Sequence, residues 1–192
     1  MDIFQMLSDI SGNQEMIKKL NQSVNAEPDK LEKAVQIGIP MLMEALNRNT
    51  NTPQGAQSLA KALEQHQNDQ VDDLTGFFNK VDTQDGSQIL QHIFTNKNQV
   101  VQQNFSKTTG LKLDQVSSLL STLAPLLLGI LGNQKKTQNL DANGISNLTS
   151  SLSQGLQQTG GGNLFSLATQ LLDTNKRGSI FDEILGFLFK RK

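Results

Sequence analysis

The chain has 192 residues, enough for one large domain or two small ones, and only 18% of them are charged, with a net charge of −1. This balance excludes the broad positive field that attracts a protein to nucleic acid or to anionic lipid. The chain has no cysteine, which excludes disulfide bonds, thiolate nucleophiles and cysteine-ligated metal sites.

The N-terminal sequence MDIFQMLSDI lacks a basic segment followed by a long apolar run. We therefore expect no secretory signal peptide and a cytoplasmic protein.

Apolar residues recur every three or four positions along most of the chain, as at Leu148, Leu152 and Leu156, and no run alternates apolar with polar residues. This periodicity predicts an all-α fold.

Polar stretches that contain glycine or proline interrupt the helical pattern and divide the chain into about ten helices. They lie at residues 11–12, 25–29, 47–53, 82–86, 108–113, 133–144, 160–163 and 173–178.

The acidic segment DTQDGSQI, at 82–89, has a spacing of acidic residues that fits a calcium loop poorly. It predicts instead a turn at Asp85-Gly86, with Ser87 capping the next helix.

Internal repetition organises the chain. A shift of 85 residues carries Pro40 onto Pro125, and the apolar triplet 41–43 onto 126–128. The segment GSIFDEIL at 178–185 then resembles GSQILQHI at 86–93. We therefore predict a helical bundle or superhelix built from two similar halves. The halves are 1–85 and 86–177, followed by a C-terminal apolar helix at 178–192, all within one compact domain.

Each predicted half has a central helix with an internal proline, which costs a helix about 3 kcal/mol. The presence of this proline in both halves predicts a kink at Pro40 and Pro125, or two helices joined end to end.

The apolar run LAPLLLGILG at 123–132 would span about 15 Å as a helix, half of a bilayer core. We therefore expect a buried helix rather than a membrane span, with Gly129 and Gly132 allowing a neighbouring helix to approach closely.

Three segments of the second half resemble a known bacterial family. They are Gly86-Ser87-x-Ile89-Leu90-x-His92-Ile93-Phe94, Thr109-Gly110-Leu111, and Val116-x-x-Leu119-Leu120-x-x-Leu123-Ala124-Pro125-Leu126-x-x-Gly129-x-Leu131-Gly132. In this order they are similar to the family of unknown function numbered 937, also called YidB-like. The resemblance implies an all-helical domain and carries no established activity, so it transfers no catalytic residue. Asp85 and Thr95 stand where the resemblance predicts glycines, so we expect the turns that flank this helix to differ.

His92, one of two histidines, is the sharpest candidate for chemistry, as a metal ligand or a general base. No second histidine lies at a metal-ligand spacing, so we expect His92 to be a partly buried packing residue. An active site between the two halves, lined by His92, Asp82 and Asp85, is an alternative. We expect no catalytic residue, no metal ion and no cofactor.

Other polar clusters have simpler interpretations. His66 lies in EQHQND and is expected to be exposed to solvent. Asp69, Asp72 and Asp73 precede an apolar run, and helix N-termini favour carboxylates at such positions. The glycines at 160–162 lack the lysine and hydroxyl residue of a phosphate-binding loop, so we predict a flexible connector there.

The C-terminal sequence SIFDEILGFLFKRK has the character of an interacting segment. We expect it to dock on the helical body, with a membrane surface or a second copy of the chain as alternatives. The residues that would make this contact are Ile180, Phe181, Ile184, Phe187, Leu188, Lys190 and Arg191.

These features favour a non-enzymatic scaffold or protein-interaction module. The alternatives are a peripheral membrane protein that uses the C-terminal helix and an enzyme with a site near His92. Nucleic-acid binding is not expected, because the chain has no tyrosine or tryptophan for base stacking and no basic stripe. The sequence identifies no ligand, no partner and no oligomeric state.

Overall fold

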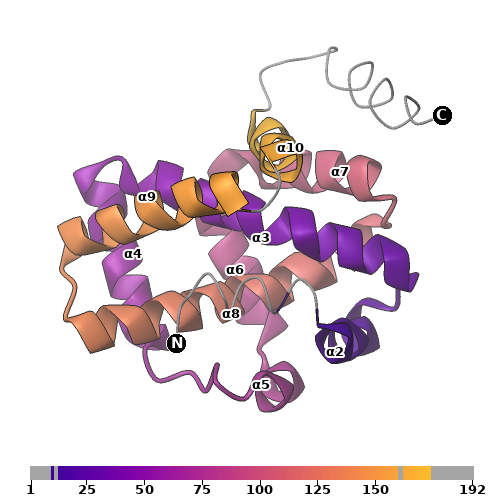
Figure 1. The fold of residues 1–192 in the computed structure, drawn as a ribbon, viewed down its shortest axis with the longest axis horizontal. Helices are drawn as coiled ribbons and strands as arrows, with labels where there is room; N and C mark the ends of the chain where they lie inside the picture. Colours follow the sequence, from indigo (N-terminus) through magenta and orange to yellow (C-terminus); the bar gives the residue numbers. More distant parts are fainter. Residues whose placement is uncertain (1–9, 11–12, 160–161, 174–192) are drawn as a thin grey trace.

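The computed structural model describes residues 10, 13–159 and 162–173, and the regular structure within these ranges is entirely helical (Figure 1). The all-α prediction is confirmed for this part of the chain. The elements are α2 (Gln14–Val24), α3 (Pro28–Thr50), α4 (Pro53–His66), α5 (Leu74–Lys80), α6 (Thr83–Phe94), the 3₁₀ turn η1 (Thr95–Lys97), α7 (Asn98–Thr109), α8 (Leu113–Gln138), α9 (Ala142–Thr159) and α10 (Gly162–Leu172).

Local sequence signals set most of the helix ends. The side chains of Asn13, Thr52 and Asp82 accept hydrogen bonds from free backbone N–H groups at the starts of α2, α4 and α6. Asn25 and Gly110 end α2 and α7 in the left-handed conformation, with φ of 51° and 75°. These are the residue types that adopt that conformation at least cost.

The two helices with internal prolines, α3 and α8, cross the molecule side by side (Figure 1). Each continues through its proline, Pro40 in α3 and Pro125 in α8. The alternative of two helices joined end to end is therefore wrong. The core of the protein gathers around this pair.

The apolar run at 123–132 is buried inside the protein, as its sequence predicts. Every residue from Leu119 to Gly132 is buried, because α2, α3, α4, α6 and α7 all pack against α8. By length and composition alone, α8 is the one helix in the described ranges that could cross a membrane, and 83% of its most apolar window is buried within the fold. Its apolar side chains are covered by protein.

Two helices, α4 and α6, approach α8 closely at glycines. A Cβ atom built on Gly86 of α6 would lie 1.8 Å from the Ser121 carbonyl oxygen, and one built on Gly132 would lie 2.7 Å from the Leu63 carbonyl oxygen. Ser121 is four residues before Pro125, so its carbonyl receives no helical hydrogen bond from the proline nitrogen. The backbone of α6 therefore approaches α8 at the carbonyl that Pro125 leaves free.

The turn between α6 and η1 contains an unusual backbone conformation. Thr95 has φ of 52° and ψ of −131°, a region that β-branched residues rarely adopt and that glycine adopts readily. The family resemblance predicts a glycine at this position. Asp85, the other predicted glycine, lies inside the first turn of α6.

Some helix boundaries differ from those predicted. Asp82, rather than Ser87, caps α6, because its carboxylate accepts hydrogen bonds from the N–H groups of Gln84 and Asp85. The break predicted at 133–144 is much shorter, since α8 continues to Gln138. The connection at 67–73, with the short helix α5 that follows it, was not among the predicted breaks.

A polar network joins α3, α9 and the end of α10. Glu44 accepts hydrogen bonds from the Arg48 Nε atom at 2.8 Å and from the Ser153 hydroxyl at 2.7 Å, and Arg48 also pairs with Asp173 at 2.6 Å. Partial burial would lower the pKa of Arg48, but the hydrogen bonds to Glu44 and Asp173 raise this pKa above its usual value. Arg48 stays charged at every ordinary pH, so its contribution to stability is fully present across the neutral range.

Candidate functional site

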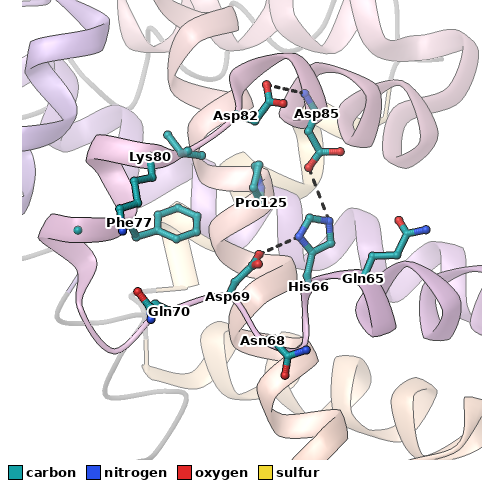
Figure 2. Close-up of a pocket in the computed structure, with 12 residues that line it drawn as sticks. Gln65, His66, Asn68, Asp69, Gln70, Phe77, Lys80, Asp82, Asp85 and Pro125 are labelled. Carbon is teal, nitrogen blue, oxygen red and sulfur yellow. Dashed lines mark hydrogen bonds and ion pairs between the residues drawn. The ribbon is translucent and has the colours of Figure 1, made fainter.

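A pocket of about 400 Å³ lies between the end of α4, helix α5, the start of α6 and the middle of α8 (Figure 2). The continuous stretch 65–85 therefore supplies all of the lining except Pro125, which comes from the distant helix α8. The residues that line it are Gln65, His66, Asn68, Asp69, Gln70, Gly76, Phe77, Lys80, Val81, Asp82, Asp85 and Pro125.

His66 is held between two carboxylates in this pocket. Its Nδ1 atom lies 2.8 Å from Asp69 Oδ2, and its Nε2 atom lies 3.7 Å from Asp85 Oδ2. The side chain is only 13% exposed, so the expectation that His66 is solvent-exposed is wrong. Asp69 follows three residues after the helical end that carries His66, and the packing of α6 brings Asp85 to the opposite ring nitrogen.

The start of α6 fixes the position of the remaining acidic group. Asp82 Oδ1 accepts hydrogen bonds from the N–H groups of Gln84 at 2.8 Å and Asp85 at 3.3 Å. The carboxylate therefore stands at the positive end of the helix dipole, where a negative charge is stabilised. Asp73 caps α5 in the same way, through a 2.9 Å bond from the Gly76 N–H.

An apolar wall faces these polar groups. Phe77 lies on the opposite side from His66 and Asp85, and Pro125 lies between Phe77 and these two residues, as Figure 2 shows. The Phe77 ring makes an edge-on contact with Phe78, with ring centres 5.9 Å apart. None of the residues of α5 is fully buried, so this helix is the least buried of the four that form the pocket.

The predicted trio of His92, Asp82 and Asp85 is divided between two places. Asp82 and Asp85 line the pocket, but His92 is exposed on α6 and does not, so the expectation that it is partly buried is wrong. The histidine that lines the pocket with Asp82 and Asp85 is His66, not His92 as predicted. The spacing of His66 and Asp69 was a usable signal, but Asp85 reaches them only through tertiary packing.

The lining combines charged groups, an imidazole and apolar side chains. It contains no serine, threonine, cysteine or tyrosine to act as a nucleophile. Among the residues that the structure describes, no group of three histidine, aspartate or glutamate side chains is arranged to hold a metal ion. The pocket supplies carboxylates, one imidazole, one ammonium group and an apolar wall, which are the kinds of group that ligand sites use for orientation and shape.

The predicted interaction residues of the C-terminal helix lie outside the described residues. They are Ile180, Phe181, Ile184, Phe187, Leu188, Lys190 and Arg191. The glycines at 160 and 161, part of the predicted connector, lie outside them as well. The connector's last glycine, Gly162, is the first residue of α10.

Comparison with protein families matches residues 5–134 to the family described as bacterial protein of unknown function (DUF937). Comparisons with curated proteins and with solved structures give no match. The matched range covers more than half of the chain and contains α2 to α7 and most of α8, including the three segments that carried the resemblance. The protein therefore belongs to this bacterial family of unknown function, also called YidB-like.

Proposed function

We propose that the protein is a non-enzymatic helical scaffold or protein-interaction module. The observation that carries this proposal is the composition of the pocket between α4, α5 and α6. Its carboxylates and apolar wall are suited to recognition, and its lining has no serine, threonine, cysteine or tyrosine. A near-neutral, amide-rich chain also limits unspecific electrostatic binding to other molecules.

We further propose that the scaffold consists of two similar halves. The helix boundaries support this, because a shift of 85 residues carries Pro28, the start of α3, onto Leu113, the start of α8. A shift of 89 residues carries Pro53, the start of α4, onto Ala142, the start of α9. The helices that precede each central helix, α2 and α7, occupy equivalent places in the order of elements.

The packing of the helices also supports two similar halves. Helix α4 of the first half packs against α8 of the second, and α9 of the second packs against α3 of the first. Helix α2 contacts both central helices, and α7 does the same. Such reciprocal packing fixes the halves against each other and provides the rigid frame that an interaction surface needs.

Site-specific photo-crosslinking in the native bacterium tests the interaction module. A photoreactive residue at Gln70, exposed at the pocket, should give an adduct with a defined protein, and the same residue at Gln154, exposed on α9, should not. Adducts of equal yield and identity from both positions, or none from Gln70, would contradict a pocket-centred interaction.

An enzyme is the second candidate, favoured by the pairing of His66 with Asp69 at 2.8 Å. Such a pair orients an imidazole for proton transfer. The substitution His66→Gln keeps a hydrogen-bonding side chain but removes proton transfer at neutral pH. It should leave the yield of Gln70 adducts within about twofold for an interaction module, whereas an enzyme with this base would lose its turnover.

Peripheral membrane association through 178–192 is a third proposal, supported by the apolar sequence and the basic end of that segment. Three basic residues contribute only about 1 kcal/mol each at an anionic surface. Co-sedimentation of the full chain with anionic vesicles, compared with a Phe187→Ser/Leu188→Ser variant, tests it. Equal sedimentation of the two proteins would exclude this role and would agree with a cytoplasmic protein.

A further inference from the structure

The pocket carries negative charge that the described residues do not neutralise. Asp69, Asp82 and Asp85 line it, and Lys80 is the one lysine or arginine of its lining. Within the ranges that the structure describes, the ion pairs of Asp69 and Asp85 are to His66, and Asp82 is bonded to backbone N–H groups. A cation would therefore be attracted to this pocket over the Debye length of about 8 Å.

The apolar wall narrows the chemistry of the occupant. Phe77, Val81 and Pro125 offer an aromatic ring and aliphatic surface beside the carboxylates. A lysine or arginine side chain fits such a site, because its stem packs on apolar surface while its charged end pairs with carboxylate. A hydrated inorganic cation would gain nothing from this wall.

The chain itself contains a segment with this chemistry. Its last residues, Phe187-Leu188-Phe189-Lys190-Arg191-Lys192, join an apolar run to the one place in the sequence with three consecutive basic residues. Within the described ranges the adjacent basic pairs are held in helices: Lys18 and Lys19 lie in α2, and Lys135 and Lys136 lie in α8, where they contact Glu64 and Asn68.

The reach of the chain allows this contact. The last described residue, Asp173, is tied to Arg48 at the end of α3. A stretch as long as 174–192 spans roughly 60 Å when fully extended. This length exceeds the distance across a compact domain of this size. The basic end can therefore reach any face of its own molecule.

We propose that the basic C-terminal end of this chain, Lys190–Lys192, docks in the pocket between α4, α5 and α6 of the same molecule. One of its cationic side chains pairs with the solvent-facing side of Asp69 or Asp85, beside His66, with its stem against Phe77. The contact is autoinhibitory, because a partner that presents a lysine or arginine side chain must displace the tail. The docking itself needs no second protein, whereas its autoinhibitory effect rests on the proposed interaction role.

Paramagnetic broadening in the full-length chain tests the proposal. The substitution Gly186→Cys gives the only thiol in the protein, and a nitroxide attached there leaves all three basic residues intact. The amides of Gly76, Lys80 and Asp85 should be broadened. The substitutions Lys190→Gln, Arg191→Gln and Lys192→Gln, made together outside the described body, should abolish that broadening without altering the rest of the spectrum.

A matched pair of body variants completes the test. Asp69→Asn/Asp85→Asn should lower the ratio of docked to free tail roughly five- to tenfold, and the control Asp29→Asn/Asp114→Asn removes the same charge from exposed positions on α3 and α8. Broadening that persists in Asp69→Asn/Asp85→Asn, or that falls on α7 and α10 instead, would overturn the proposal. Broadening of isotope-labelled, untagged chains by added tagged chains would also overturn it, because the occupant would then be a second copy.

Discussion

At the residue scale, two glycines in packed helices have very different surroundings. A Cβ atom on Gly86 would lie 1.8 Å from a backbone oxygen of α8, whereas a Cβ atom on Gly38 of α3 would lie 3.4 Å from the flexible Leu123 side chain. The first distance requires the backbone of α6 or α8 to move, and the second is an ordinary contact. Both residues are inside helices, so alanine gains the same intrinsic preference of about 1 kcal/mol at either position.

The substitution Gly86→Ala should therefore lower the free energy of unfolding by at least about 2 kcal/mol, because α6 is forced away from the Ser121 carbonyl. Gly38→Ala should change it by less than about 1 kcal/mol. Urea unfolding followed by circular dichroism measures both. Equal stability of Gly86→Ala and the native protein would show that α6 does not pack against α8 as described.

The conformation of Thr95 leads to a second residue-scale prediction. A non-glycine residue at positive φ costs roughly 1–2 kcal/mol, so Thr95→Gly should raise the free energy of unfolding by about 1 kcal/mol. Asn139 also has positive φ, of 50°, but asparagine tolerates the left-handed region, so Asn139→Gly is the matched control with a smaller effect. Thermal unfolding of the two variants compares them. A destabilised Thr95→Gly would contradict the strained turn.

The same scale shows how far the sequence predicts the candidate site. The spacing of His66 and Asp69 lies within one helical turn and is visible in the sequence. Asp85 is brought to His66 by the packing of α6 on α8, which the local spacing of the sequence does not show. His92 is a candidate from the sequence because the chain has only two histidines. The rarity of a residue type does not predict whether its side chain is buried, and His92 is exposed.

At the element scale, local chemistry predicts helices well where caps and breakers are strong. The ends of α2, α4 and α7 coincide with an asparagine, a threonine before proline, and a glycine. The boundaries of α5 and α8 were predicted less well. The connection at 67–73 has no proline or glycine, and the polar end of α8 has the composition of a loop but is helical to Gln138.

Helices α5 and α8 also differ in burial, which predicts a difference in local stability. No residue of α5 is fully buried, whereas α8 is buried throughout its middle. Backbone amides of α5 should exchange with solvent at least about 100-fold faster than those of residues 123–131, since local opening of α5 uncovers little apolar surface. Hydrogen exchange measured by NMR resolves both helices. Equal protection would show that α5 opens only when the whole protein unfolds.

At the scale of the whole molecule, the proposed halves predict equal roles for equivalent residues. Leu46 and Leu131 are related by the shift of 85 residues, and both are buried. Substitution of either by alanine should lower the free energy of unfolding by about 2–5 kcal/mol, with the two values within about 1 kcal/mol of each other. Denaturant unfolding measures both, and a difference of more than about 2 kcal/mol would count against similar halves.

The central claim is that protein, not lipid or water, covers the apolar middle of α8. Because the chain lacks cysteine, Ser121→Cys and Leu113→Cys each introduce a single thiol on this helix, at side chains that are 4% and 51% exposed in the native protein. In buffer without lipid, the thiol at 113 should react with a water-soluble disulfide reagent at once. The thiol at 121 should react at least about 1,000-fold more slowly, through rare unfolding. Equal rates, or protection of the thiol at 121 only when vesicles are added, would contradict the account.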